Sequence, residues 1–119
     1  MNKAFAVFAA VAVASSIPGA AWAASDGKNR NVTVENVASQ SIYYLYASPA
    51  TSTTWEEDLL GSGTIPSGSS KVANIDNGTN ECIYDLKVKF ADGREAIQWK
   101  VNVCAVSTWS VGDSGNSIR

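Results

Sequence analysis

Residues 82–104 read CIYDLKVKFADGREAIQWKVNVC, and this stretch decides the fold. Two segments in which apolar and polar residues alternate flank the pair Asp92-Gly93, and such alternation is typical of half-buried β-strands. Asp-Gly is a favoured two-residue turn between antiparallel strands. The stretch therefore predicts a β-hairpin in which Ala91 pairs with Arg94.

This register sorts the hairpin into an apolar and a polar face. The predicted apolar pairs are Leu86 with Trp99, Val88 with Ile97 and Tyr84 with Val101, and the predicted polar pairs are Asp85 with Lys100 and Lys87 with Gln98. Trp99 is accordingly expected in the core.

Cys82 and Cys104 are the two cysteines of the chain and have a single intrachain pairing. A disulfide closing this loop would stabilise a small domain by roughly 3 kcal/mol. The predicted register places Cys82 opposite Val103, with Cys104 on the other face. A Cys82–Cys104 disulfide then requires a bulge near residues 102–104 or a strand that bends out of the hairpin. A disulfide-linked dimer and free thiols are the alternatives.

Further strands are expected at 32–37, 41–47, 70–75 and 105–111, where β-branched and aromatic residues lie between Gly, Asn, Ser and Asp. The strand 41–47 is apolar on both faces, which favours a central strand buried on two sides over a strand with an exposed aromatic patch. Six or seven short strands indicate an all-β chain, a small antiparallel β-sandwich of immunoglobulin-like architecture or a small barrel-like sheet.

Residues 54–61 interrupt the β pattern. Thr54 and Glu57 have the spacing of a capping box, acidic residues follow Trp55, and Gly61 is placed to end a helix. This segment predicts one short helical turn near 55–60 that packs Leu59 or Leu60 inward.

The start of the chain has the layout of a secretory signal peptide: Lys3, an apolar run, Pro18-Gly19 and a small-residue cleavage site ending at Ala23. The predicted organisation is a cleaved signal peptide (1–23), a flexible N-terminal tail (24–30), a β-sandwich domain (31–111) and a flexible C-terminal tail (112–119). The protein is thus expected in the periplasm or outside the cell, as a monomer and without membrane insertion after cleavage.

The composition argues against several classes of function. The chain has no histidine, which removes imidazole-based catalysis and metal binding, and paired cysteines would not act as nucleophiles. A net charge of −2 without a basic run argues against nucleic-acid binding. We therefore expect no catalytic residues, no metal and no cofactor, and a protein that is not an enzyme.

The leading hypothesis is a non-catalytic binding module that contacts a protein partner. Its candidate surface comprises Trp55, Glu56, Glu57, Asp58 and Trp109, although core packing for the tryptophans and helix capping for the acidic residues are the alternatives. Two other functions remain open: a secreted protease inhibitor presenting the loop 48–54, and a small hydrolase in which two of Asp58, Asp76 and Asp85 converge.

The motifs Trp55-x-x-Asp58-Leu59-Leu60-Gly61, Cys82-x-Tyr84-Asp85, Asp92-Gly93 and Cys104 occur in this order. The ordered set resembles a group of small exported bacterial all-β proteins of uncharacterised function. The resemblance spans nearly all of the chain after the signal peptide. It implies that Trp55, Asp58, Gly61 and Asp85 belong to one shared framework, and it implies no activity.

Overall fold

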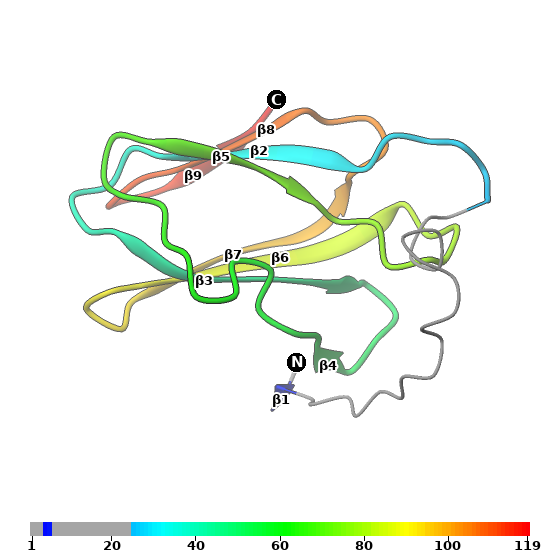
Figure 1. The fold of residues 1–119 in the computed structure, drawn as a ribbon, viewed down its shortest axis with the longest axis horizontal. Helices are drawn as coiled ribbons and strands as arrows, with labels where there is room; N and C mark the ends of the chain where they lie inside the picture. Colours follow the sequence, from blue (N-terminus) through cyan, green and yellow to red (C-terminus); the bar gives the residue numbers. More distant parts are fainter. Residues whose placement is uncertain (1–3, 6–24) are drawn as a thin grey trace.

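The computed structural model describes residues 4–5 and 25–119, and in this part the chain is all-β with no helix (Figure 1). The predicted signal peptide lies outside the described residues apart from Ala4–Phe5. None of the described segments is a helix long and apolar enough to cross a bilayer.

Two packed sheets form the body of the protein, as the predicted β-sandwich requires (Figure 1). The four-stranded sheet has the order β5 (Ser70–Asn74), β2 (Asn31–Asn36), β8 (Thr108–Val111), β9 (Asn116–Ile118). The three-stranded sheet has the order β3 (Ile42–Pro49), β6 (Ile83–Phe90), β7 (Glu95–Asn102). A further short parallel pair joins β1 (Ala4–Phe5) to β4 (Thr54–Trp55). All pairings within the two larger sheets are antiparallel except that of β2 with β8.

The core lies between the two sheets and is built from alternate residues of their strands. Trp109 on β8 is its largest fully buried side chain, and its indole Nε1 donates a hydrogen bond to Asn116 Oδ1 at 2.9 Å. Fully or almost fully buried residues of β2, β3, β6 and β8 belong to the same core: Val32, Val34, Ile42, Leu45, Tyr84, Leu86, Val88 and Val111. The alternation of buried and exposed residues along β2 is the pattern that a strand with one face in the core produces.

The hairpin β6–β7 is present, but its predicted register is wrong by one residue near the turn. The loop has three residues rather than two: Phe90 N–H bonds to Arg94 O, and Gly93 takes a φ of 93°. Asp-Gly suits this loop as well, since its last residue adopts the left-handed conformation. Leu86 therefore pairs with Gln98 rather than with Trp99. A slip of one residue exchanges the two faces, and Trp99 is 43% exposed instead of buried.

A bulge restores the predicted pairing farther along the hairpin. The register shifts between Tyr84 and Leu86, so that Tyr84 pairs with Val101 as expected. Lys100 lies in the bulge with a φ of 56°, and its backbone N–H donates to Asp85 Oδ1 at 2.9 Å. Asp85 is buried and stabilises this irregular backbone.

The predicted disulfide is confirmed. Cys82 and Cys104 are bonded, with their Cα atoms 5.4 Å apart. Strand β7 ends at Asn102, where the chain turns and the N–H groups of Ala105 and Val106 bond to Asn102 O. Of the two irregularities that the sequence allowed, the structure has the strand that bends out of the hairpin.

Strand β3 is an edge strand of its sheet, so the expectation of a central strand buried on both faces is wrong. A bulge between Ile42 and Tyr44 explains the two apolar faces. It keeps Ile42 and Leu45 in the core while Tyr44 is 41% exposed. The strand carries an exposed aromatic patch, the alternative that the sequence analysis ranked second.

The predicted helical turn near 55–60 is also wrong. Trp55 belongs to β4, and a turn follows at residues 59–62. Asp58 Oδ1 accepts the N–H groups of Leu45 at 2.9 Å and Leu60 at 3.0 Å, and Leu59 N–H bonds to Leu45 O at 2.7 Å. The segment is thus attached to the free edge of β3, and this tertiary contact prevails over the local capping signal.

Both expected tails are more ordered than predicted. Residues 116–118 form β9, which pairs with β8, and Arg119 N–H bonds to Thr108 O at 2.9 Å. Near the other end, Arg30 is buried at 2% exposure and binds Asp26 through two hydrogen bonds. The ordered domain therefore extends beyond the predicted 31–111.

Candidate recognition face

The outer surface of the sheet β3–β6–β7 carries a row of aromatic side chains together with two lysines. We call this surface the aromatic face and define it by Tyr44, Tyr46, Trp55, Lys87, Lys89 and Trp99. Strand alternation explains its composition: Tyr44 and Tyr46 are two residues apart on β3, and Lys87 and Lys89 are two residues apart on β6. The bulge in β3 and the three-residue loop before β7 direct Tyr44 and Trp99 away from the core.

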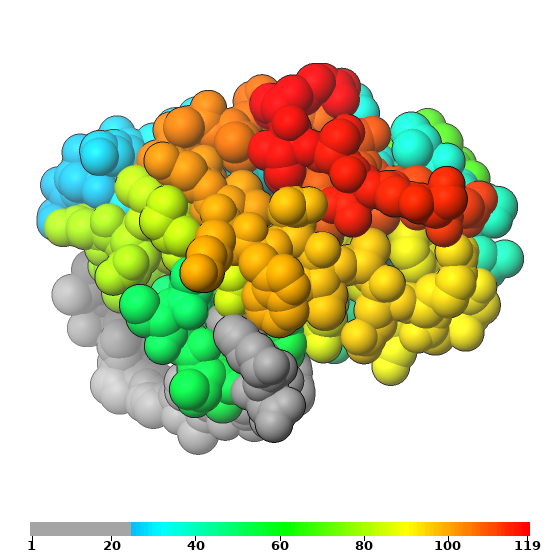
Figure 2. Space-filling model, turned by 180° about the vertical axis from the view of Figure 1, so that it is seen from behind, coloured from blue at the N-terminus to red at the C-terminus, as the bar shows by residue number. Residues whose placement is uncertain are grey.

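The rings form a continuous series. Tyr44 and Tyr46 are stacked with their ring centroids 6.1 Å apart and an interplanar angle of 6°. Trp55 lies 6.5 Å from Tyr46 and 6.0 Å from Trp99, in tilted arrangements. Figure 2 shows the green spheres around β4 beside the orange spheres of β7, which are far apart in the sequence. Trp55 thus joins the aromatic residues of β3 to that of β7.

Both lysines contact these rings through cation–π interactions. Lys87 Nζ is 5.1 Å from the ring centroid of Tyr46 and 4.9 Å from that of Trp55. Lys89 Nζ is 5.9 Å from the centroid of Tyr44. Lys87 also forms an ion pair with Glu95 at 3.7 Å. Among the described residues, no carboxylate lies within 4.0 Å of Lys89.

The chain segment around β4 has its own means of attachment to this face. Asp58 holds it to β3, as described above, and Ser52 Oγ accepts the N–H of Thr54 at 3.2 Å. Burial raises the pKa of the Tyr46 phenol above its ordinary value, and the negative charge of Asp58 contributes in the same direction. Tyr46 therefore stays protonated at neutral pH and keeps its ability to donate a hydrogen bond.

The predicted site residues separate into three groups. Trp55 is part of the aromatic face, but at 3% exposure it supports neighbouring rings rather than projecting as an anchor. Asp58 binds backbone, while Glu56 is half-buried and Glu57 exposed. Trp109 is wrong as a surface residue because it is fully buried between the sheets.

The carboxylates of the hydrolase alternative have separate structural roles. Asp58 and Asp85 each accept backbone N–H groups, from the β3 edge and from the β7 bulge. Asp76 belongs to a turn in which its Oδ1 accepts Gly78 N–H at 3.0 Å. The described residues contain no group of three or more Cys, Asp or Glu side chains that could hold a metal ion.

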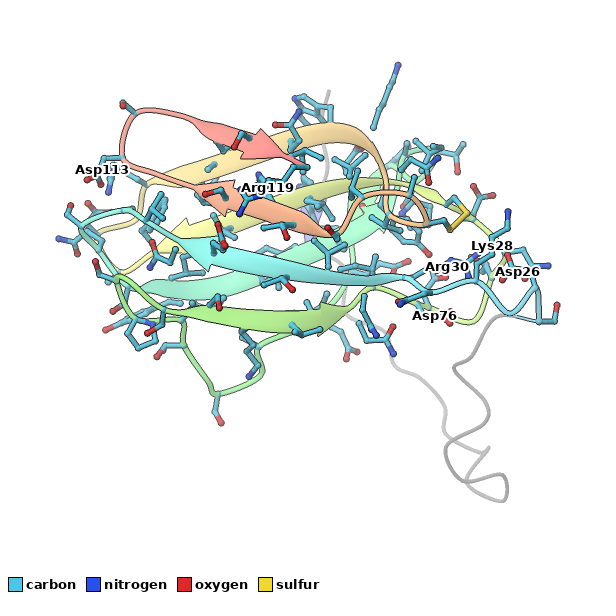
Figure 3. All side chains as sticks on the ribbon, turned by 90° about the horizontal axis from the view of Figure 1, so that it is seen from above. Asp26, Lys28, Arg30, Asp76, Asp113 and Arg119 are labelled. Carbon is cyan, nitrogen blue, oxygen red and sulfur yellow. A yellow bond between two sulfur atoms is a disulfide. The ribbon has the colours of Figure 1, made fainter. Side chains whose placement is uncertain are left out.

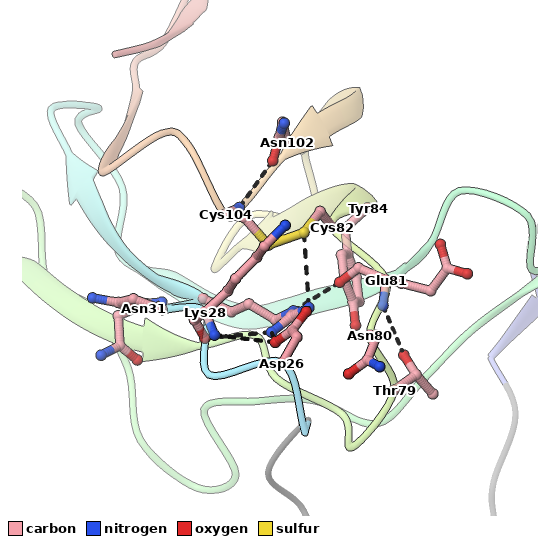
Figure 4. Close-up of a disulfide and its surroundings, with 12 residues drawn as sticks. Asp26, Lys28, Asn31, Thr79, Asn80, Glu81, Cys82, Tyr84, Asn102 and Cys104 are labelled. Atoms are coloured by element: carbon pink, nitrogen blue, oxygen red, sulfur yellow. Dashed lines mark hydrogen bonds and ion pairs between the residues drawn. A yellow bond between two sulfur atoms is a disulfide. The ribbon is translucent and has the colours of Figure 1, made fainter.

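Charged residues at the two ends of the sandwich also have structural partners (Figure 3). Asp26 and Arg30 lie at the end with the disulfide, where Arg30 Nε donates to Glu81 O at 2.7 Å (Figure 4). Hydrogen bonds from the Arg30 guanidinium hold the pKa of Asp26 well below its usual range. Asp113, at the opposite end, accepts Ser39 N–H and Arg94 Nη2, and its pKa is lowered as well. These groups fasten loops to the sheets.

The sequence did not predict that Tyr44, Lys87, Lys89 and Trp99 lie on one surface, or that Trp99 is exposed. A signal was available in the repeated spacing Tyr44-x-Tyr46 and Lys87-x-Lys89, which places two rings and two ammonium groups on single faces of their strands. The alignment of these faces depends on bulges, which the spacing alone does not predict. Comparisons with protein-family models, with curated proteins and with solved structures find no match to this chain.

Proposed function

We propose that this protein is an exported, non-catalytic binding module whose recognition surface is the aromatic face. The observation that carries the proposal is the exposure of Tyr44 and Trp99, at 41% and 43%, at the two ends of a continuous series of rings. Soluble proteins seldom expose contiguous large apolar side chains, and such patches often mark interaction sites. Tyr and Trp are also enriched among the residues that dominate binding energy.

The rigidity of the surroundings supports this assignment. The face lies on paired strands, and its adjoining segment is attached through Asp58 and Leu45. Rings fixed by stacking and by cation–π contacts lose little conformational entropy when a ligand binds. The aromatic face is thus a preorganised surface rather than a mobile loop. For this reason the proposed site lies on the outer surface of the sheet β3–β6–β7 and not at residues 56–58 or Trp109.

The proposed export rests on the signal-peptide pattern of residues 1–23, and a Cys82–Cys104 disulfide is compatible with an oxidising compartment. The proposed absence of catalysis rests on the lack of histidine and on the structural roles of Asp58 and Asp85.

The test uses the full chain, expressed with its own N-terminus in an exporting host and crosslinked in the intact envelope. The double variant Tyr44→Ser/Trp99→Ser removes the two exposed rings. Val72→Ser is the matched control, since Val72 is 60% exposed on the other sheet. We expect the double variant to lose the crosslinked species that wild type and Val72→Ser both form. Equal crosslinking by all three folded proteins, or loss with Val72→Ser alone, would contradict the proposal.

A further inference from the structure

The aromatic face is extended, which limits the kind of ligand that it can take. Its rings are distributed over β3, β4 and β7, and successive centroids lie 6.0–6.5 Å apart. Small-molecule sites are usually concave and enclose most of the ligand. A hollow does lie between residues 90–97 and the loop 112–116, but none of the six residues of the aromatic face lines it. A row of rings on a sheet suits an extended polymer that makes repeated contacts.

The stacked tyrosines indicate what such a polymer presents. Aromatic rings have an electron-rich face that attracts weakly positive C–H groups. One side of a pyranose ring is a flat patch of such C–H groups, and its hydroxyls point outward around the rim. Tyr44 and Tyr46 stack on each other at alternate positions of one strand, and Tyr44, at 41% exposure, supplies the platform of this pair. Trp99 supplies a further exposed platform on β7.

The charges of the face indicate the second property of the ligand. The chain as a whole has a net charge of −2, whereas the six residues that define the aromatic face include two lysines. Glu95 is the cross-strand partner of Lys89, but its carboxylate pairs with Lys87 at 3.7 Å, and among the described residues Lys89 has no carboxylate within 4.0 Å. An ammonium group beside an exposed tyrosine ring can bind an anionic group of a ligand whose apolar side rests on that ring. The remainder of the acidic protein would repel such a ligand and direct it to this face.

We infer that the aromatic face binds an acidic polysaccharide, with sugar rings on Tyr44 and Trp99 and a carboxylate or other anionic substituent at Lys89. This inference rests on the proposed function and deepens it by naming the ligand class. An acidic peptide would satisfy Lys89 but lacks the flat C–H surface that the exposed rings of Tyr44 and Trp99 accommodate. A neutral glycan would use the rings and leave Lys89 without an anion.

The test measures binding of the purified oxidised protein to three soluble polymers by affinity electrophoresis and tryptophan fluorescence. Polygalacturonate provides sugar rings with carboxylates, a soluble neutral β-glucan provides sugar rings alone, and poly-L-glutamate provides carboxylates alone. We expect polygalacturonate to bind and the other two to bind at least tenfold more weakly. Added salt should weaken the binding, because it screens exposed charges.

Variants test separately the contact of sugar rings with Tyr44 and Trp99 and the binding of an anionic group by Lys89. Trp99→Ala and Tyr44→Ala should each lower the affinity for polygalacturonate about tenfold, while Val72→Ala leaves it unchanged. Lys89→Gln should lower that affinity and should abolish the preference over the neutral glucan. Circular dichroism and urea denaturation verify that each variant is folded, which is expected because Tyr44, Val72 and Trp99 are exposed.

Three outcomes would overturn the inference. Equal binding of poly-L-glutamate would assign the face to an acidic peptide, equal binding of the neutral glucan would remove the role of Lys89, and no binding of polygalacturonate would exclude the ligand class. In the last case, crosslinking in the envelope that still depends on Tyr44 and Trp99 would leave the proposed function standing and reject the polysaccharide alone.

Discussion

Removal of the Asp58 carboxylate is expected to destabilise the domain strongly, although the residue is only half-buried. Asp58 Oδ1 accepts two backbone N–H groups, from Leu45 at 2.9 Å and from Leu60 at 3.0 Å. Leu45 is fully buried, so in Asp58→Ala its N–H would lose its acceptor in a partly buried site. An unsatisfied buried donor costs about 1–3 kcal/mol, and a hydrogen bond to a charged acceptor contributes about 1.5–3 kcal/mol. The Leu60 N–H, in a turn, can bond to water instead.

We therefore expect Asp58→Ala to lower the free energy of unfolding by about 2–3 kcal/mol, measured by urea denaturation under oxidising conditions. Asp58→Asn keeps an acceptor oxygen and should lose less than about 1 kcal/mol. Glu57→Ala, a neighbouring exposed carboxylate, should stay within about 0.5 kcal/mol of wild type. If Asp58→Ala were as stable as Glu57→Ala, Asp58 would not fasten this segment to β3, and the argument would be refuted.

Three further predictions concern the disulfide, the β7 bulge and the buried arginine. Replacing Cys82 and Cys104 by serine opens a loop of sequence separation 22 and should lower the free energy of unfolding by about 3 kcal/mol; an unchanged urea midpoint would contradict this. Lys100→Gly should raise the free energy of unfolding by up to about 1 kcal/mol, because Lys100 has a φ of 56° that glycine adopts without strain, whereas Lys100→Ala should give no such gain in the same measurement. The pKa of Asp26 is depressed in the folded state, so the stability from its contact with Arg30 is present above the unfolded-state pKa of about 3.9 and is lost as the pH falls further. Asp26→Asn should accordingly show a shallower fall in melting temperature than wild type between about pH 5 and pH 2, and parallel profiles would speak against the pair.

The sequence predicted the fold class because its strand signals are local and repeated. Apolar and polar residues alternate along β2 and β6, and turn residues lie between successive strands of the chain. The pairing of Cys82 with Cys104 followed from the presence of two cysteines, and the predicted register then required either a bulge or a bend, of which the structure has the bend at the end of β7.

The register of the hairpin could not be predicted, because Asp92-Gly93 fits both a two-residue loop and the three-residue loop that is observed. One residue of difference moved Trp99 from the core to the surface. The same kind of irregularity at β3 placed Tyr44 outside. The aromatic face therefore depends on the length of the hairpin loop and on the bulge in β3, and neither has a clear signal in a single sequence.

The segment around Asp58 was misassigned for a different reason. Thr54 and Glu57 have the spacing of a helix cap, and this local preference is weak compared with contacts to a strand edge. Asp58 satisfies the exposed backbone of β3 instead, which a sequence read without a partner strand does not reveal. Trp109 illustrates the opposite case, since both a core and a surface role were open and the fold placed it at the centre.

The central claim is that the outer face of the sheet β3–β6–β7 is the surface that meets a ligand. The most direct measurement replaces Tyr44 by the photo-crosslinking amino acid p-benzoylphenylalanine in the full chain and irradiates intact exporting cells. The same replacement at Val72 samples the opposite sheet, where the exposed fraction is 60%. The account predicts discrete adducts of protein or glycan from position 44 and none from position 72. Equal adducts from both positions, adducts from position 72 alone, or none from either would contradict it.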